Sequence, residues 1–126
     1  MNVVDAGVVV ELVAGGLDPQ LLGDEELAVP HLLDSEVINA LRRLVLAKNL
    51  TSDQAEAALR GFLSLTLTRY PADWLRLRMW DLRHNVSGYD ATYVALAEQT
   101  GATELLTTDA RLANTPDIQC AVSVLS

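Results

Sequence analysis

The sequence predicts an α/β domain with a mainly parallel central sheet. Short apolar segments typical of strands alternate along the chain with amphipathic segments typical of helices. The 126 residues suffice for one domain with a hydrophobic core, and 50% of them are hydrophobic. No linker, repeat or low-complexity segment divides the chain, so we expect a single domain over residues 1–126.

The first half of the chain is predicted to hold one strand and three helices. The opening run NVVD is typical of a buried strand. The helices are expected over residues 8–15, about 31–48 and about 52–63. Gly15 ends the first helix, Pro30 opens the second, and Thr51 caps the third. Residues 18–26 form a short polar connection or helix.

The second half is predicted to hold three strands and three helices. The strands are expected over residues 65–70, 104–107 and 122–125. The helices are expected over about 73–84, 91–100 and 109–114. Ser87 and Asp90 have the spacing of a capping box at the start of the middle helix, which ends at Gly101.

Composition indicates a protein of the reducing cytoplasm. No apolar run reaches the roughly 18 residues that span a bilayer, and Asp5 interrupts the first apolar stretch, which argues against a signal peptide. The single cysteine, Cys120, cannot form an internal disulfide, and its apolar neighbours predict a buried thiol in a strand.

The charge is unevenly distributed. The formal net charge of −8 argues against general nucleic-acid binding. Residues 42–83, however, hold eight of the nine Lys and Arg residues against four acids. This central segment could face a polyanion or an acidic partner, or could simply form solvated helix faces.

Four acidic residues lie in apolar or small-residue surroundings: Asp5, Glu36, Asp90 and Asp109. Carboxylates are rarely buried without compensation, so four such residues suggest one shared site. Asp5 and Asp109 each follow a predicted strand, and the carboxyl ends of parallel strands meet at one edge of a sheet.

Each acid also has an ordinary structural explanation. Asp5 and Asp109 could be turn or helix-cap residues, and Asp90 could interact with a helix dipole. Glu36 could form an ion pair with Arg43 at the edge of the apolar stripe of its helix. Asp34 is a competing carboxylate, but it projects to a different part of that helix, and we prefer Glu36.

A hard divalent cation, Mg²⁺ or Mn²⁺, would relieve the repulsion among clustered carboxylates. Such an ion acidifies water and stabilises charge on phosphate, which points to metal-assisted hydrolysis of a phosphodiester. This chemistry requires no nucleophilic Ser or Cys. Neither His31 nor His84 has a convincing metal-ligand partner nearby, which argues against zinc.

Four motifs, VVDAGVVVEL, LLDSEVINALRR, SGYDATYVALAE and LLTTDARLA, resemble in order and spacing a PIN domain, most closely the VapC-type toxins of bacterial toxin–antitoxin pairs. The resemblance covers nearly the whole chain. It implies a three-layer α/β/α sandwich and a Mg²⁺- or Mn²⁺-dependent ribonuclease. It also implies a homodimer that is neutralised by a cognate VapB-type antitoxin.

The resemblance places the four acids of the family on Asp5, Glu36, Asp90 and Asp109. It implies that Asp5 and Asp90 bind metal directly. Glu36 and Asp109 would bind metal through water or at a second ion, or would orient the attacking water.

The chain departs from the family at Gly7, where a Ser or Thr is usual two residues after the first Asp. Thr107 and Thr108 retain hydroxyls before Asp109 and are candidates to support the site. Arg42 and Arg43, on the Glu36 helix, are candidates to bind RNA or a partner. The two tryptophans, Trp74 and Trp80, are predicted to pack and not to stack on bases.

The main alternative is a non-catalytic PIN-like module that binds a protein, which only Gly7 favours. A receiver-like phosphoacceptor domain would need a lysine near the last strand, and the only lysine is Lys48. A haloacid-dehalogenase-like phosphatase would need a second Asp at position 7. The chain also lacks the Gly-rich loop with Lys of P-loop enzymes.

Overall fold

The computed structural model describes residues 1–126 and contains a five-stranded, fully parallel sheet. The strands are β1 (Asn2–Val4), β2 (Leu27–Pro30), β3 (Thr68–Tyr70), β4 (Leu105–Thr107) and β5 (Val122–Val124). They are arranged in the order β3-β2-β1-β4-β5. Val3 of the central strand pairs with Ala28 on one side and Leu105 on the other. The predicted α/β class is confirmed.

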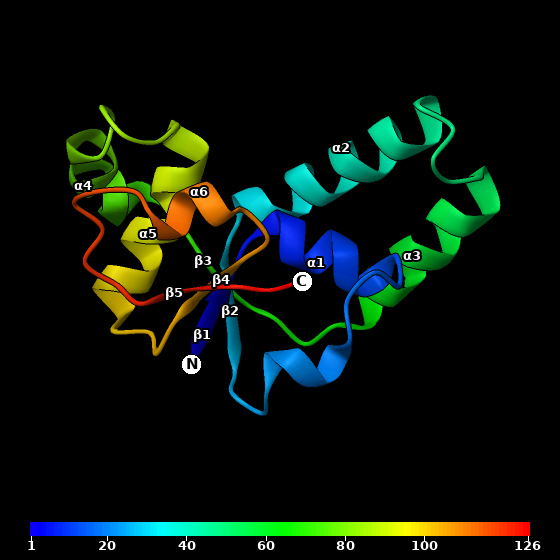
Figure 1. The fold of residues 1–126 in the computed structure, drawn as a ribbon, viewed down its shortest axis with the longest axis horizontal. Helices are drawn as coiled ribbons and strands as arrows, with labels where there is room; N and C mark the ends of the chain where they lie inside the picture. Colours follow the sequence, from blue (N-terminus) through cyan, green and yellow to red (C-terminus); the bar gives the residue numbers. More distant parts are fainter.

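Helices cover both faces of this sheet, giving three α/β/α layers (Figure 1). One layer holds α1 (Ala6–Val13), α2 (Leu32–Leu46) and α3 (Ser52–Ser64), which contact one another. The other holds α5 (Gly88–Thr100), which contacts β1, β2 and β4, and α4 (Arg76–Asp81), which packs on α5. The short helices are η1 (Pro19–Leu22), η2 (Asp73–Leu75) and α6 (Ala110–Ala113).

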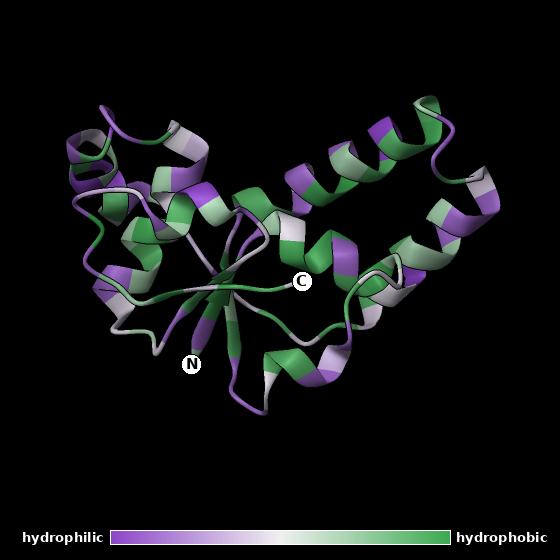
Figure 2. Cartoon of the chain, viewed as in Figure 1, coloured by the Kyte–Doolittle hydropathy of each residue, from purple (hydrophilic) through white to green (hydrophobic).

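The core is continuous through the sheet, whose strands are mostly apolar at the centre of the molecule (Figure 2). Helix α5 lies deepest, because every residue from 91 to 97 is buried. It is enclosed between the sheet and α4, so it has no solvent-facing stripe in that stretch. Asp90 stands at the start of this buried segment. No helix of the fold is both long and apolar enough to cross a membrane.

The strand β2 is missing from the sequence prediction, which expected Pro30 to open a helix. Pro30 instead ends β2, and α2 begins at Leu32 after His31. A proline is tolerated there because the pairing of β1 with β2 ends at Ala28, so the ladder requires no N–H from Pro30 on that side. The short segment LAVP has little of the β-branched alternation by which strands are recognised.

Four further expectations need correction. The strand predicted over 65–70 contains only Thr68–Tyr70, and the helix predicted over 73–84 divides into η2 and α4. Cys120 is half-buried and precedes β5. The capping box forms only one of its two hydrogen bonds, from the Asp90 backbone N–H to Ser87 Oγ (3.1 Å).

Candidate active site

The candidate site lies at the carboxyl edge of the sheet, where the strand order reverses between β1 and β4. The chain steps from β1 through β2 to β3 on one side, and from β4 to β5 on the other. Parallel α/β sheets bind ligands in the crevice outside the carboxyl ends of the strands at such a point. Asp5 directly follows β1, and Asp109 lies two residues beyond the end of β4.

Asp5 both caps a helix and faces the other acids. Its Oδ1 accepts a hydrogen bond from the Val8 N–H (3.0 Å), and its Oδ2 accepts one from Thr107 Oγ1 (2.5 Å). Thr107 is fully buried, and its hydroxyl oxygen accepts from the Asp109 N–H (3.0 Å). Burial raises the pKa of Asp5, and the charges on Asp90 and Asp109 add to this effect. The helix cap therefore uses only Oδ1, and the carboxylate still lies close enough to the other acids to feel their charges.

Glu36 is held by a tyrosine that the sequence analysis did not identify. Tyr93 of α5 is 2% exposed, and its hydroxyl donates to Glu36 Oε1 over 2.6 Å. Burial raises the pKa of Glu36, and the charges on Asp90 and Asp5 raise it further. No ion pair joins Glu36 to Arg43, so that explanation of Glu36 is wrong. The signal for Tyr93 was its position three residues after Asp90, on the same helical face.

Asp90 is the third acid without a cationic partner. It lies in the first turn of α5, and its own backbone N–H is occupied by Ser87. Burial raises the pKa of Asp90, the Asp109 charge adds to this, and Arg111 partly opposes it. The unformed half of the capping box leaves the Asp90 carboxylate available to the cluster.

Asp109 is in a different situation from the other three acids. Its Oδ1 caps α6 by accepting from the Arg111 N–H (2.9 Å), and its Oδ2 pairs with Arg111 Nη2 (3.1 Å). The Arg111 guanidinium lowers the pKa of Asp109, whose side chain is 37% exposed. The expectation of apolar surroundings is therefore wrong for Asp109. The sequence analysis missed Arg111, although it lies only two residues further along the chain.

The four acids are close enough to influence one another, but they do not form a preassembled metal cage. Burial and mutual repulsion raise the pKa of Asp5, Glu36 and Asp90. No three His, Cys, Asp or Glu side chains of the chain are placed to coordinate one ion directly. Mg²⁺ usually takes one or two protein carboxylates and keeps several waters. The set of hard oxygen donors fits an ion held in this way.

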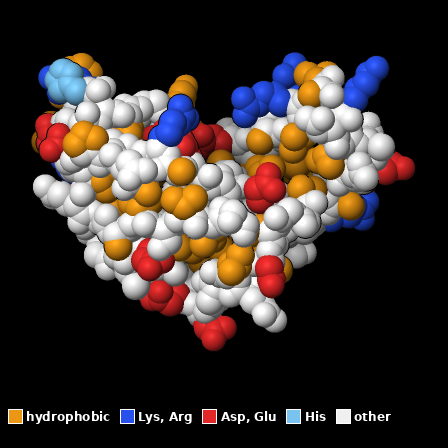
Figure 3. Space-filling model, in the orientation of Figure 1, with side chains coloured by type: hydrophobic (Ala, Val, Ile, Leu, Met, Phe, Trp, Pro, Cys, Tyr) orange, Lys and Arg blue, Asp and Glu red, His pale blue; other side chains and the backbone are white.

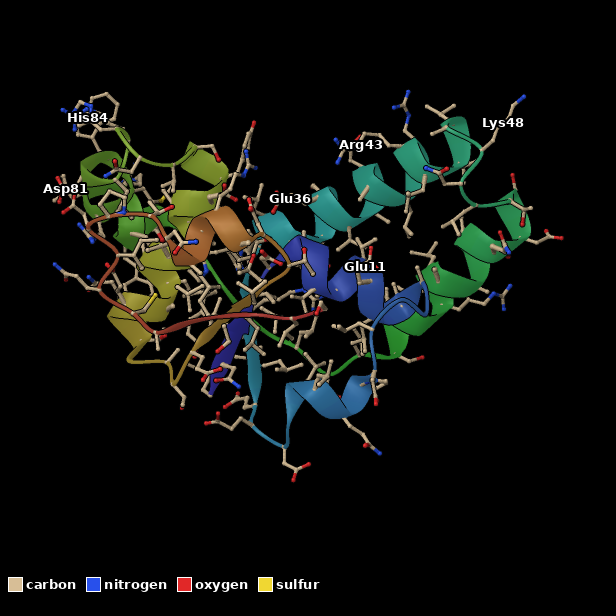
Figure 4. All side chains as sticks on the ribbon, in the orientation of Figure 1. Glu11, Glu36, Arg43, Lys48, Asp81 and His84 are labelled. Atoms are coloured by element: carbon tan, nitrogen blue, oxygen red, sulfur yellow. The ribbon has the colours of Figure 1, made fainter.

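Cavities open on both sides of the acids. Glu36 and Arg43 line two neighbouring cavities of about 500 and 460 Å³. Asp90, Asp109 and Arg111 line a third of about 320 Å³. Figure 3 shows acidic side chains at the base of an indentation, with basic side chains on both rims, and Figure 4 places Glu36 near the start of α2 with Arg43 further along it.

The structure separates the two arginines that the sequence grouped. Arg43 is exposed, forms no ion pair and shares both larger cavities with Glu36. Arg42 instead lines a groove between α2 and α3, beside apolar side chains of both helices. Of the two, only Arg43 is positioned beside the acids.

Gly7 makes room for Thr108. A Cβ atom on Gly7 would lie 2.5 Å from Thr108 Oγ1 and 3.4 Å from Asp5 Oδ1. Both residues line the 500 Å³ cavity together with Glu36. Thr108 is exposed, and its hydroxyl forms no hydrogen bond within the protein. A hydroxyl is therefore present beside position 7, although Gly7 itself has none.

Comparison with known proteins agrees with this geometry. The PIN-domain family matches residues 3–118. The chain is 43% identical to ribonuclease VapC9 of Mycobacterium tuberculosis, covering 99% of this chain and 98% of that protein. It is 44% identical to ribonuclease VapC1 of the same species, covering 98% and 96%.

Solved structures show the same fold. PAE2754 from Pyrobaculum aerophilum has a TM-score of 0.67 and 26% identity, covering 96% of this chain and 87% of that one. VapBC2 from Rickettsia felis, bound to a DNA fragment from its promoter, has a TM-score of 0.69 and 14% identity, covering 99% and 98%.

The fold and the matched residues together define a class, a doubly wound parallel domain with acids at its switch point. The chain belongs to the PIN-domain family, and within it to the VapC-type proteins.

Proposed function

We propose that the chain is the toxin of a VapBC-type toxin–antitoxin pair and acts as a Mg²⁺- or Mn²⁺-dependent endoribonuclease. The observation that supports this most is the group Asp5, Glu36 and Asp90, three half-buried carboxylates that form no ion pair and whose pKa values are raised. The relatives that share over 40% identity with nearly the whole chain are named ribonucleases.

In this proposal, Asp5 and Asp90 would hold the divalent cation directly, and Glu36 and Asp109 would act through water, at a second ion, or by orienting the attacking water. When bound, the cation lowers the pKa of a water molecule and stabilises negative charge on the phosphate. Thr107 is a positioning residue, because its hydroxyl holds Asp5 Oδ2.

Two further residues complete the assignment. Tyr93 fixes the orientation of Glu36 through its hydroxyl. A tyrosine hydroxyl is protonated at neutral pH, and burial raises the pKa of Tyr93 further, so it donates to Glu36 throughout this range. Arg43 binds the RNA backbone beside Glu36, where it offsets the repulsion between phosphate and the acids.

Cleavage of total RNA tests this function. Wild-type protein is expected to cut with Mg²⁺ or Mn²⁺ and to stop when a chelator is added, whereas Asp5→Ala is inactive under all three conditions. Glu36→Gln is also expected to lose cleavage. Its matched control is Asp34→Asn, which should still cut, because Asp34 lies two residues away on α2 but pairs with Arg69 (2.8 Å). Equal cleavage by wild type and Asp5→Ala, or cleavage that survives chelation, would contradict the mechanism. Binding of a protein partner by a wild type that cuts no RNA would favour the non-catalytic, protein-binding alternative.

The proposed partner is a VapB-type antitoxin that places an Arg or Lys in the acidic site and so blocks metal and RNA together. Purified antitoxin is expected to reduce cleavage by the wild type; undiminished cleavage at saturating antitoxin would argue against this partner.

We also propose a homodimer. Contrary to our expectation that the tryptophans pack internally, Trp74 is 48% and Trp80 65% exposed, and Leu77 between them is 86% exposed. An exposed apolar surface of this kind is typical of protein contacts. The mass in solution, measured by light scattering for wild type and Leu77→Asp, tests this assignment.

A further inference from the structure

Apart from Glu36 and Arg43, the residues of the cavity that Tyr89 borders have no role in the proposed mechanism. The cavity has a volume of about 460 Å³, within the range of about 300–1,000 Å³ found for small-molecule pockets. It is lined by Leu32, Ser35, Glu36, Asn39, Arg43 and Tyr89. Because Glu36 is one of these residues, the cavity is continuous with the candidate active site.

One wall of the cavity is a single stripe of α2. Ser35, Asn39 and Arg43 are spaced four residues apart, so they lie one above the other on the same helical face. Each of the three is exposed, and none uses its side chain in a hydrogen bond or ion pair within the protein. The stripe therefore presents a hydroxyl, an amide and a guanidinium that are free to bind a ligand.

The other wall is an exposed aromatic ring. Tyr89 comes from the first turn of α5, directly before Asp90, and is 65% exposed. Its hydroxyl forms no hydrogen bond within the protein. An aromatic ring that mostly faces solvent gains little from packing, but it offers a flat surface for stacking.

We propose that this cavity binds one unpaired nucleobase of the RNA next to the phosphate that is cut. Tyr89 stacks on the base, Ser35 and Asn39 hydrogen-bond to its edge, and Arg43 contacts the adjoining phosphate. Single-stranded RNA is recognised in this way, through bases stacked on aromatic side chains and read by polar groups at their edges. The inference rests on the proposed ribonuclease function and names a subsite of that same site.

The test measures binding separately from cleavage. The probes are single-stranded oligoribonucleotides of mixed sequence that carry 2-aminopurine at successive positions, titrated into Asp5→Asn protein so that no cutting occurs. We expect stacking to quench the 2-aminopurine fluorescence at one position. Adding Tyr89→Ala should remove this quenching and weaken binding about 5- to 10-fold, the lower part of the range for loss of one stacked base. Tyr89→Phe should retain both properties.

Leu63→Ala is the control, because Leu63 is also largely exposed (74%) but lines none of the described cavities and lies outside the proposed dimer surface. It should change neither the quenching nor the affinity. Salt dependence separates stacking from charge: Arg43→Ala should reduce the slope of log K against log salt by about 0.7, as expected for one phosphate contact on a single strand. Tyr89→Ala should leave that slope unchanged.

Unchanged quenching and affinity in Tyr89→Ala would overturn the inference, and so would an equal loss in Leu63→Ala. Failure of the ribonuclease function gives a different result, because the wild type would then leave unlabelled RNA intact whatever the binding assay reports.

Discussion

The two ends of α5 carry acidic side chains in opposite electrostatic surroundings. Near the C-terminal end, the Glu98 side chain is 5% exposed and accepts hydrogen bonds from Arg78 Nε (2.6 Å) and Nη2 (3.0 Å) and from the Gln119 N–H (2.7 Å). At the N-terminal end, Asp90 has no ion-pair partner, because the neighbouring Arg111 pairs with Asp109. Its pKa is raised, with burial as the main cause.

Glu98 shows how this fold compensates a buried carboxylate that has a structural role. Burying a charge costs free energy unless a partner and hydrogen bonds compensate it, and Arg78 supplies both for Glu98. The fold can therefore place an arginine against a buried acid. Asp90, Asp5 and Glu36 form no ion pair with an arginine. This end of the molecule therefore keeps acidic charge that no cationic side chain neutralises, as the proposed cation site requires.

The largest expected effect is the loss of cleavage in Asp90→Asn. The substitution keeps the shape of the side chain but removes the charge that would hold a cation, so cleavage of total RNA should fall at least about 100-fold. Glu98→Gln, on the same helix, should cut RNA at the wild-type rate per folded molecule. Comparable losses in both variants would mean that the two ends of α5 do not differ in function.

The second effect reverses the comparison, because Glu98→Gln should destabilise the fold. It leaves Arg78 facing a neutral amide and weakens three hydrogen bonds, and we expect a loss of about 2 kcal/mol in the free energy of unfolding. Urea unfolding of wild type and Glu98→Gln measures this. Arg60→Gln is a control, because Arg60 pairs with Glu56 on the surface and its loss should change stability little.

Gly7 sharpens the comparison on the Asp5 side of the cluster. Gly7→Ser should cost about 1 kcal/mol, because its Cβ meets Thr108 Oγ1 and the β-branched Thr108 has few alternative rotamers. Gly7→Ser combined with Thr108→Ala should recover most of that stability. If Gly7→Ser unfolds at the wild-type urea concentration, the space beside Asp5 is not limited by Thr108.

The sequence predicted the layers better than the strands. Long, strongly patterned helices such as 52–63 were placed within one or two residues, because Thr51 and Gln54 form a full capping box. The strand LAVP was missed because three or four residues carry too little periodicity, and its pairing with β1 and β3 is decided by tertiary contacts.

The candidate site divides along the same line. The sequence could single out Asp5, Asp90 and Asp109 from their positions at strand ends and a helix start. It could not show that Tyr93 holds Glu36 or that Arg111 neutralises Asp109, since both depend on how side chains meet across elements. Adjacent residues of a helix point about 100° apart, so Arg42 and Arg43 leave α2 on different faces. Only the packing of α3 beside α2 shows that the Arg42 face borders the groove between these helices.

The smallest expected effect concerns stability and pH in the absence of a cation. The folded state raises the pKa of Asp90 above its ordinary value of 3.8, so between these two values the folded protein binds more protons than the unfolded chain. The contribution of Asp90 to stability is therefore fully present below pH 3.8 and is lost as pH rises through the folded pKa.

Asp90→Asn removes this dependence, so with chelator present it should unfold at a higher urea concentration than wild type at pH 7. The advantage should shrink as the pH falls toward 4. Glu98→Gln should remain less stable than wild type at pH 7, because it loses interactions with Arg78 that require the charged carboxylate. If Asp90→Asn stabilises the fold at pH 7 and Glu98→Gln destabilises it, the candidate site lowers the stability of the fold at Asp90. If Asp90→Asn instead lowered stability at pH 7, Asp90 would be a structural cap of α5.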